Sequence, residues 1–309
     1  MLNRIIEFFN KCDSQSLKDS LDELDEEIRN IFRERGSEID RFIINVIKDR
    51  DADFYVWFCF LKANFLRGNV IVSNRKFKSF CSEVQPYDYY YVKFPEGKLC
   101  PHLNWRFAGS LEMVLQDIKE KFRSGKEFVN KIKEITKSYD DPLLRYFELI
   151  RFLNGFKGIS NKIANAVLSE LSGEIFSLEK YEKHNTVNRL LKEKWLYNLF
   201  LSSFFNIMID SHVRKFFKEK LNLKNADQIA LILIGKHVRK EIIAELFERQ
   251  FYWINEEYRR RILEKYSEFV GANLIEKVIW MVYFVKKNLR KKKTLEEFKF
   301  FKLSNNPFI

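Results

Sequence analysis

The chain has 309 residues, of which 46% are hydrophobic and 32% charged, and its formal net charge is +12. This length is enough for one bilobed domain or two smaller ones around a large core. With only 10 glycines and 5 prolines, long runs rich in Leu, Ile, Phe, Glu and Lys predict a mostly helical protein. No apolar run reaches the length of a membrane span, and the charged N-terminus is unlike a signal peptide, so we expect neither a membrane-spanning nor a secreted protein.

The positive charge is unevenly distributed. Residues 1–50 carry nine Lys or Arg and twelve Asp or Glu, so the rest of the chain carries +15. Such a balance indicates an anionic partner, with phosphate the first choice and a merely solvated surface the alternative. The four cysteines, Cys12, Cys59, Cys81 and Cys100, are too far apart for a metal-binding pair. We therefore expect reduced thiols, no metal, and an intracellular, cytoplasmic protein.

The first half of the chain predicts helices separated by one irregular stretch. Residues 1–50 indicate two or three amphipathic helices with an acidic face, and the heavily apolar residues 51–66 indicate a buried helix. Residues 70–109 hold three of the five prolines and many aromatic residues, which predicts a loop or a short hairpin. Its rings either pack over a lobe or stack on exposed bases. Helix resumes at Leu111 and is interrupted at residues 122–126.

Residues 143–173 predict two helices joined by a tight turn. Asp141 is suited to cap the first helix, with Pro142 at its first position and Gly155 beyond its end. The apolar face of this helix is expected at Leu143, Phe147, Ile150 and Leu153. After the turn, Ser160 is suited to cap a second helix that ends at Gly173 and whose apolar face comprises Ile163, Ala164, Val167, Leu168 and Leu171.

The turn from Phe156 to Ala164, FKGISNKIA, resembles the helix-hairpin-helix of the DNA glycosylases related to endonuclease III and 8-oxoguanine glycosylase. Ser160 replaces the second hairpin glycine, which changes how the turn amides are aimed. The resemblance implies an all-α, two-lobed fold with an active cleft between the lobes. Residues 51–172 would form the central lobe; residues 1–50 and 173–309 would form the second lobe, with an insert at 174–206 and a basic C-terminal tail.

A second stretch, NIMIDSHVR at residues 206–214, resembles the other signature of this family. By that resemblance, Asp210 is a catalytic carboxylate and His212 faces a DNA phosphate. Asp210 also suits the ordinary role of capping the helix that follows, and this alternative stays open. The same resemblance places Gly155, Lys157, Gly158 and Ser160 against a DNA phosphate, which they would hold without reading the base sequence.

The resemblance also suggests where the base would be handled. Asn64 matches a side chain that enters the DNA, although a polar residue at a buried helix end is an equal alternative. Trp280, in the closing helical segment, would line the base pocket. Leu274 and Val278 occupy the positions where relatives that recognise 8-oxoguanine carry glutamine and phenylalanine, so their base-recognition set is not carried over.

The chemistry implied is excision of a damaged base through a lysine imine. Lys162 would attack the anomeric carbon of the sugar as a neutral amine, and Asp210 would stabilise the positive charge that develops on the sugar. A free lysine has a pKa of roughly 10.4. The N-terminal end of the helix dipole and nearby cations such as Lys157 disfavour the charged form of Lys162. A solvated structural lysine is the alternative.

These patterns together predict a DNA glycosylase with abasic-site lyase activity. The first choice of lesion is 8-oxoguanine and the second an oxidised pyrimidine, because the family branch with a hairpin lysine and no iron–sulfur cluster resembles the 8-oxoguanine enzymes. The expected partner is double-stranded DNA with a damaged base or abasic site, bound by a monomer associated with the nucleoid. We expect no cofactor other than a monovalent cation at the hairpin. The alternatives are a non-catalytic DNA-binding protein and a helical interaction protein.

Overall fold

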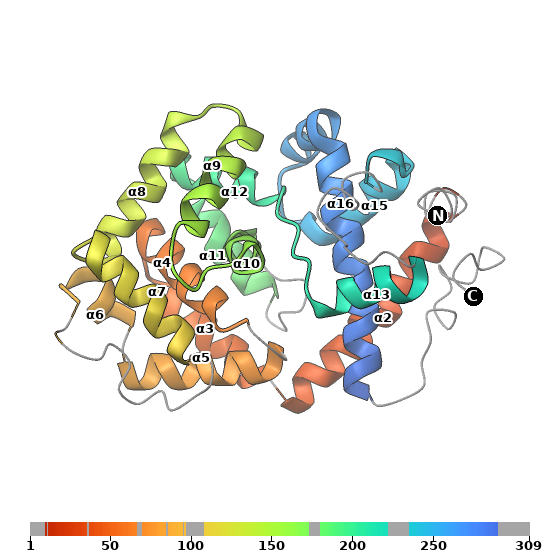
Figure 1. Ribbon diagram of the computed structural model, residues 1–309. Coiled ribbons are helices and arrows are strands. Elements are labelled where there is room, and N and C mark those ends of the chain that lie inside the picture. The colour runs from red at the N-terminus through yellow and green to blue at the C-terminus, as the bar shows by residue number, and fades with distance from the viewer. Residues whose placement is uncertain are drawn as a thin grey trace. The chain divides into compact units, whose positions relative to one another are not determined.

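The computed structural model describes residues 10, 12–35, 37–66, 70–84, 86–94, 96, 108–172, 180–221 and 235–289. Within these ranges every regular element is an α-helix and no strand occurs, which confirms the all-α prediction (Figure 1). The expected basic tail beyond residue 289, Gly173 and Cys100 lie outside the described residues.

The chain divides into two compact units, each described here by itself. Unit 1 combines both chain ends, Met1–Ile31 and Ile207–Ile309, and unit 2 is Phe32–Asn206. The sequence placed residues 32–50 and 174–206 in the lobe of the chain ends. By its contacts the chain instead groups them with residues 51–172. The helices that follow Ser172 carry large apolar residues, and these are buried in unit 2: Trp195, Leu199 and Phe200 are at most 5% exposed.

Unit 2 is built around the apolar helix predicted at residues 51–66. This helix, α4 (Ala52–Asn64), begins at the Asp51 side chain, which accepts the Phe54 N–H, and almost all of its residues are buried. The unit also contains α3 (Ser37–Ile47), α7 (Ala108–Lys121), α8 (Gly125–Ser138), α9 (Pro142–Asn154), α10 (Asn161–Ser172), α11 (Lys180–Leu190) and α12 (Lys194–Ser203). A helix that is apolar all round must be covered on every side, and α10, α8, α6 (Pro86–Tyr91) and α3 cover α4.

The joint between α7 and α8 requires a glycine. The helix is interrupted between Lys121 and Gly125, within the predicted residues 122–126, and the Ser124 hydroxyl accepts the Glu127 N–H to cap α8. A side chain at Gly125 would place its Cβ 2.8 Å from the Trp57 ring and 2.8 Å from the Tyr89 carbonyl oxygen. The absence of a side chain therefore lets α8 approach α4, and the Phe128 ring of α8 packs edge to face against Trp57 of α4.

The loop or hairpin predicted at residues 70–109 is wrong for its first half. Residues 70–91 form α5 (Val70–Val84) and α6 (Pro86–Tyr91), and residues 97–107 lie outside the described part. Val70, Ile71, Phe77 and Phe80 are buried at helical spacing, and Pro86 occupies the first position of α6, where a missing N–H costs nothing. The apolar residues recur at helical spacing, but the many aromatic residues and Pro86 led to the prediction of a loop.

Helix α9 begins and ends where predicted but buries a different face. The Asp141 carboxylate accepts the Leu143 and Leu144 N–H groups, and Gly155 follows the last helical residue. The exposed side includes Phe147, which is 50% exposed, whereas Arg145 is 2% exposed. The Arg145 guanidinium donates to the carbonyl oxygens of Thr136, Tyr139, Asp140 and Asn198. These acceptors, supplied by the end of α8 and by α12, are what allow a charged residue inside.

Unit 1 is formed by most of α2 (Ser14–Arg35) with α13 (Ser211–Leu221), α15 (Lys240–Phe251) and α16 (Glu256–Leu289). The backbone of α16 is non-helical at Tyr266, so α16 consists of two helical stretches joined at a kink. Helix α16 packs against both α15 and α13. Arg249 on α15 pairs with Asp22 and Asp25 on α2 at 2.7 and 2.6 Å, which ties the N-terminal helix to the C-terminal ones.

Candidate functional site

The turn between α9 and α10 is short and anchored by apolar residues. Phe156 and Ile159 are buried, whereas Lys157 and Ser160 are exposed. Gly158 has φ 85°, a conformation that other residues adopt only with strain, so the turn needs glycine there. Gly155 has an ordinary φ of −70° and only ends α9. Helix α10 begins at Asn161, and the Ser160 carbonyl oxygen accepts the Ala164 N–H at 2.9 Å.

Two side chains from α7 hold this turn. The Asp117 carboxylate accepts the Lys157 backbone N–H at 3.1 Å and the Lys121 ammonium at 2.8 Å. The same ammonium donates to the Gly155 carbonyl oxygen at 3.1 Å and lies 4.6 Å from the centre of the Phe156 ring. Burial works against the ionised form of Asp117, but the hydrogen bonds from Lys121 and from the Lys157 N–H outweigh it and lower the pKa of the carboxyl. The sequence offered no local signal for this anchor, because Asp117 lies 40 residues before Lys157.

The implied monovalent cation does not fit the turn well. Several turn carbonyls already accept a backbone N–H, namely those of Phe152, Leu153, Phe156 and Ser160. The Gly155 carbonyl accepts the positive Lys121 ammonium. A cation needs several carbonyl oxygens that converge on one point and are not already opposed by a positive group. We therefore assign the cation no role.

Lys162 lies in the first turn of α10, as predicted, and is half-buried. Its Nζ donates to the carbonyl oxygen of Leu66, just after α4, at 3.0 Å. The rest of α10 is buried against α4, the most extensive helix contact among the described residues. The amine is thus held by a hydrogen bond to the Leu66 carbonyl oxygen, which it would have to leave in order to react as a nucleophile.

Asn64 lies two residues before that acceptor and is only 2% exposed. Its side-chain amide donates to the Phe60 carbonyl oxygen at 2.8 Å. A side chain that enters DNA has to reach the surface, whereas Asn64 is buried. Its position matches the alternative given for Asn64, a polar residue at a buried helix end. We do not carry Asn64 into the proposed site.

In unit 1 the structure brings Asp210, His212 and Trp280 together. The Asp210 carboxylate caps α13 by accepting the His212 and Val213 N–H groups at 2.8 and 3.0 Å, and it accepts the Trp280 indole N–H at 2.8 Å. The His212 and Trp280 ring centres are 6.2 Å apart, edge to face, and Trp280 stacks on Phe284. Asp210 is 8% exposed. Three N–H donors fix both of its oxygens in place, an arrangement that suits a carboxylate anion.

The sequence reasoning missed Glu276, which belongs to this same group. Glu276 is 1% exposed on α16, one helical turn before Trp280. Burial, reinforced by the negative charge of Asp210 and opposed by Lys277 and the Met208 N–H, raises the pKa of its carboxyl to about 8. The available signal was a lone acidic residue in the apolar run GANLIEKVIWMVYF, where a charge is unexpected.

Leu274 and Val278, on the same helix, are 2% and 3% exposed. They pack inside unit 1 and offer no polar group to a base. Lys162 belongs to unit 2, whereas Asp210, His212 and Trp280 belong to unit 1. The two residues predicted to be catalytic, Lys162 and Asp210, therefore belong to different units.

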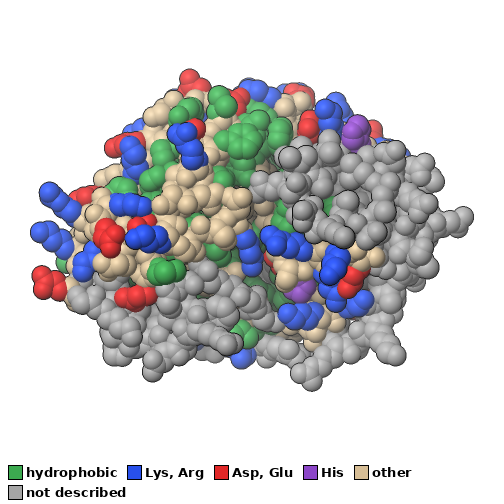
Figure 2. Space-filling model, in the orientation of Figure 1, with side chains coloured by type: hydrophobic (Ala, Val, Ile, Leu, Met, Phe, Trp, Pro, Cys, Tyr) green, Lys and Arg blue, Asp and Glu red, His purple; other side chains and the backbone are tan. Residues whose placement is uncertain are grey.

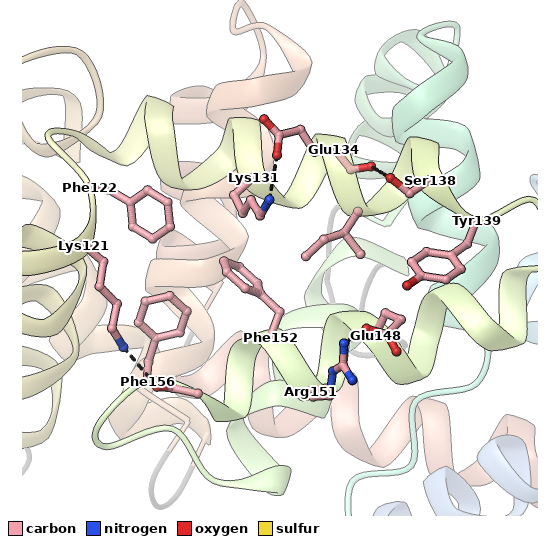
Figure 3. A pocket seen from close by; sticks show the side chains of 12 residues that line it. Lys121, Phe122, Lys131, Glu134, Ser138, Tyr139, Glu148, Arg151, Phe152 and Phe156 are labelled. Atoms are coloured by element: carbon pink, nitrogen blue, oxygen red, sulfur yellow. Dashed lines mark hydrogen bonds and ion pairs between the residues drawn. The ribbon is translucent and has the colours of Figure 1, made fainter.

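An open groove of about 600 Å³ lies between α8 and α9 and ends at the turn (Figure 3). Phe122, Phe152 and Phe156 line it beside the cations Lys121, Lys131 and Arg151. Lys131 pairs with Glu134 at 2.8 Å, and Arg151 pairs with Glu148 at 2.6 Å. Because each cation of this groove already has a carboxylate partner, the groove does not present a strong site for an anion.

On the face shown in Figure 2, Lys and Arg side chains are spread over the surface with Asp and Glu among them. Among the described residues visible in that view, the basic side chains are thus interspersed with acidic ones. Among the described helices, none combines the length and the apolar character needed to cross a bilayer. The described residues also contain no group of three or more His, Cys, Asp and Glu side chains placed to hold a metal ion. Among the described residues, Cys12, Cys59 and Cys81 are buried and form no disulfide bond.

Comparisons with protein-family models, curated proteins and solved structures found no match for this chain. The function is therefore inferred from the side chains of the turn and of the Asp210 group alone.

Proposed function

We propose that this protein is a DNA glycosylase with associated abasic-site lyase activity. The observation that carries the proposal is the turn between α9 and α10, in which Gly158 has a positive φ and a half-buried lysine, Lys162, follows in the first helical turn. The proposal treats this stretch as a helix-hairpin-helix. It gives the exposed turn a binding role and the lysine a chemical one.

The binding role follows from the start of α10. A helix N-terminus presents backbone N–H groups and a partial positive charge, which favour a phosphate. Lys157 and Ser160 are exposed beside it, and Asp117 and Lys121 hold the turn from behind. A phosphate held this way would set the register of a DNA strand without selecting its sequence.

The chemical role requires an amine. In the proposed step, Nζ of Lys162 bonds to the anomeric carbon of the sugar while the bond from that carbon to the base breaks, and the base leaves with the electron pair. The nitrogen then loses a proton, the bond from the anomeric carbon to the ring oxygen breaks as the C=N bond of the imine forms, and the ring oxygen takes up a proton. Loss of a proton from the neighbouring C2′ carbon then expels the 3′ phosphate and cuts the strand. The hydrogen bond to the Leu66 carbonyl would orient the amine before attack.

The proposal assigns Asp210 the electrostatic part. Positive charge develops on the sugar as the base leaves, and a fixed carboxylate stabilises it. The N–H donors from His212, Val213 and Trp280 hold Asp210 in one orientation, so little reorganisation would be needed during the reaction. In this assignment Trp280 supports Asp210, and His212 contributes its backbone N–H in addition to any contact with a phosphate.

The second candidate is a non-catalytic DNA-binding protein, and specific observations favour it. The Lys162 amine is already bonded to a helix-end carbonyl, and Asp210 is already engaged as a helix cap. Both residues could thus be purely structural. This candidate predicts binding that weakens steeply with salt and no covalent product.

Borohydride trapping separates the two candidates. The protein is incubated with duplex DNA containing an abasic site or 8-oxoguanine, and reduction should leave a covalent adduct if an imine forms. Lys162→Arg keeps a cation that can still donate to Leu66 but cannot form the imine, so the adduct should disappear while salt-dependent binding remains. Asp210→Asn should slow base excision and leave binding in place. Wild-type protein that binds DNA without any adduct would leave the second candidate.

The lesion is decided by a panel of duplexes. We propose 8-oxoguanine as the first substrate and an oxidised pyrimidine as the second, and release of the free base is measured for each. An adduct with the abasic duplex together with no release of either base would retain the lyase activity and reject both lesions.

A further inference from the structure

Glu276 is a buried acid that the proposed chemistry does not use. It is 1% exposed on α16, and its Oε2 has no hydrogen-bond partner among the described residues. Leaving a charged oxygen in this position would be costly, because an ionised carboxylate in an apolar interior needs a counter-charge or several donors. This burial therefore favours the protonated form of the Glu276 carboxyl over the ionised form.

The backbone places Glu276 next to the Asp210 group. Its carboxyl accepts a hydrogen bond from the Met208 N–H, two residues before Asp210. One turn further along α16, the Trp280 indole donates to Oδ2 of Asp210 at 2.8 Å. Glu276 is thus bonded to the segment that ends at Asp210, and Asp210 is bonded to a side chain one turn along the helix of Glu276. Helix α13 packs on α16.

Few other charges face this pair. Asp210 comes from the segment before α13, and Lys277 comes from the same helix as Glu276. Lys277 lies 5.7 Å from the centre of the Phe251 ring of α15. From α13 the titratable neighbour is His212, whose ring lies beside Trp280. No ion pair to Glu276 occurs among the described residues. Glu170, which is also buried, differs in this respect, because its carboxylate is 2.5 Å from the Lys62 ammonium.

The hydrogen bonds decide which of the two carboxyls keeps the negative charge. Asp210 accepts three N–H groups, and Glu276 accepts the Met208 N–H and has one oxygen without a partner. N–H donors stabilise the ionised form, and an oxygen without a donor is better suited to carry a proton. Two neighbouring carboxyls also resist double ionisation.

We propose that Glu276 is a positioning residue for Asp210, a neutral carboxylic acid that leaves the pair with a single negative charge located on Asp210. Its role in catalysis rests on the proposed function; its protonation does not. Because Glu276 is neutral, Trp280 and the Met208–Asp210 segment can pack tightly around the Asp210 carboxylate. A second anion at Glu276 would repel that carboxylate. Ionisation of Glu276 would loosen the group that orients Asp210.

Infrared spectroscopy tests the proton directly and without DNA. A protonated carboxyl has a C=O stretching band distinct from those of carboxylates. At pH 6 the wild-type protein should show such a band, and Glu276→Gln should lack it. The band should disappear only as the pH rises well above the range of ordinary glutamates. Asp210→Asn removes the negative charge next to Glu276, so the ionised form of Glu276 becomes more stable. In this variant the band should therefore disappear at a lower pH than in the wild type.

Two outcomes would overturn the proposal. One is a wild-type spectrum at pH 6 that does not differ from that of Glu276→Gln. The other is a band that disappears at the same pH in Asp210→Asn as in the wild type, which would show that the two carboxyls are independent.

A second measurement connects Glu276 to the reaction. Glutamine mimics the neutral acid, so Glu276→Gln should keep most of the trapped adduct at pH 6, where Asp210→Asn has lost most of its base excision. Above pH 8 the pH profile of the wild type should depart from that of Glu276→Gln. If the infrared result holds and no protein traps DNA, the proposed function fails and the carboxyl pair stands. If adducts form and Glu276→Gln is as impaired as Asp210→Asn at pH 6, the neutral role of Glu276 is wrong.

Discussion

Among the described residues, each unit buries one glutamate almost completely, and the two units accommodate it in opposite ways. In unit 2, Glu170 is 2% exposed and pairs with Lys62 at 2.5 Å, between α10 and α4. In unit 1, Glu276 is 1% exposed with no ion pair among the described residues and with Asp210 as a neighbour. A buried carboxyl needs either a cation or a proton. The first solution joins two helices, and the second leaves a titratable group beside a proposed catalytic residue.

Removal of the Lys62 ammonium, the partner of Glu170 in unit 2, should have the largest effect on stability. Lys62→Met takes away the ion pair of Glu170 inside the packed interface of α4 and α10, so we expect the free energy of unfolding to fall by about 3 kcal/mol. Denaturant unfolding monitored by circular dichroism measures it. Lys133→Met is the control, because Lys133 and Asp53 form a less deeply buried pair at 3.2 Å, with side chains 29% and 18% exposed, whose loss should cost about 1 kcal/mol. Equal losses would mean that burial does not distinguish the two pairs.

The proton in unit 1 should appear as a pH dependence of stability. The pKa of Glu276 is raised from 4.5 to about 8, so between these values the folded state binds a proton that the unfolded state does not. The stability of the wild type should therefore fall as the pH rises through this window and level off above it, by on the order of a few kcal/mol.

Glu276→Gln has no such proton and should not show this loss. Thermal unfolding of both proteins from pH 5 to pH 9 provides the comparison, since all other titratable groups are shared. Parallel curves for the two proteins would place the Glu276 pKa in the ordinary range.

Asp117 is the intermediate case, a buried carboxylate paired with an exposed lysine. Asp117→Asn keeps an acceptor for the Lys157 N–H and loses the ionic partner of Lys121, so we expect a loss of about 1 kcal/mol in unfolding free energy. Since the pKa of Asp117 is lowered, its contribution is present above the usual aspartate range and is lost as the pH falls through the folded pKa. Stability that differs between wild type and variant at pH 7 and converges at low pH would bear this out; a constant difference would contradict it.

The smallest effect on stability should come from the turn itself, where no carboxyl changes. Gly158→Ala forces a side chain into φ 85° and should cost about 1 kcal/mol or less, with a larger relative loss of DNA binding if the turn holds a phosphate. Gly158→Asn is the matched control, because asparagine adopts this conformation more easily. Fluorescence anisotropy with a short duplex measures binding. Equal affinity in all three proteins would remove the turn from the DNA surface.

Much of the local structure could be read from the sequence. Asp51, Ser124, Asp141 and Asp210 each accept an N–H two or three residues ahead, so each cap depends on its own neighbours in the chain. The turn at Gly158 was found for the same reason. The prediction failed for α5 and α6, where aromatic residues and Pro86 outweighed the helical spacing of the apolar residues.

What the amino-acid order by itself determined is the all-α class, the two helices that flank the turn, the position of Lys162 in the first turn of α10 and the capping role of Asp210. Only the tertiary structure decided that Arg145 is buried, that Asp117 holds the turn, that Lys62 neutralises Glu170 and that Glu276 lies beside Asp210. Caps are formed by residues two or three positions apart, whereas Lys62 and Glu170 are 108 positions apart. The free energy of a buried charge depends on partners that the fold alone brings within reach.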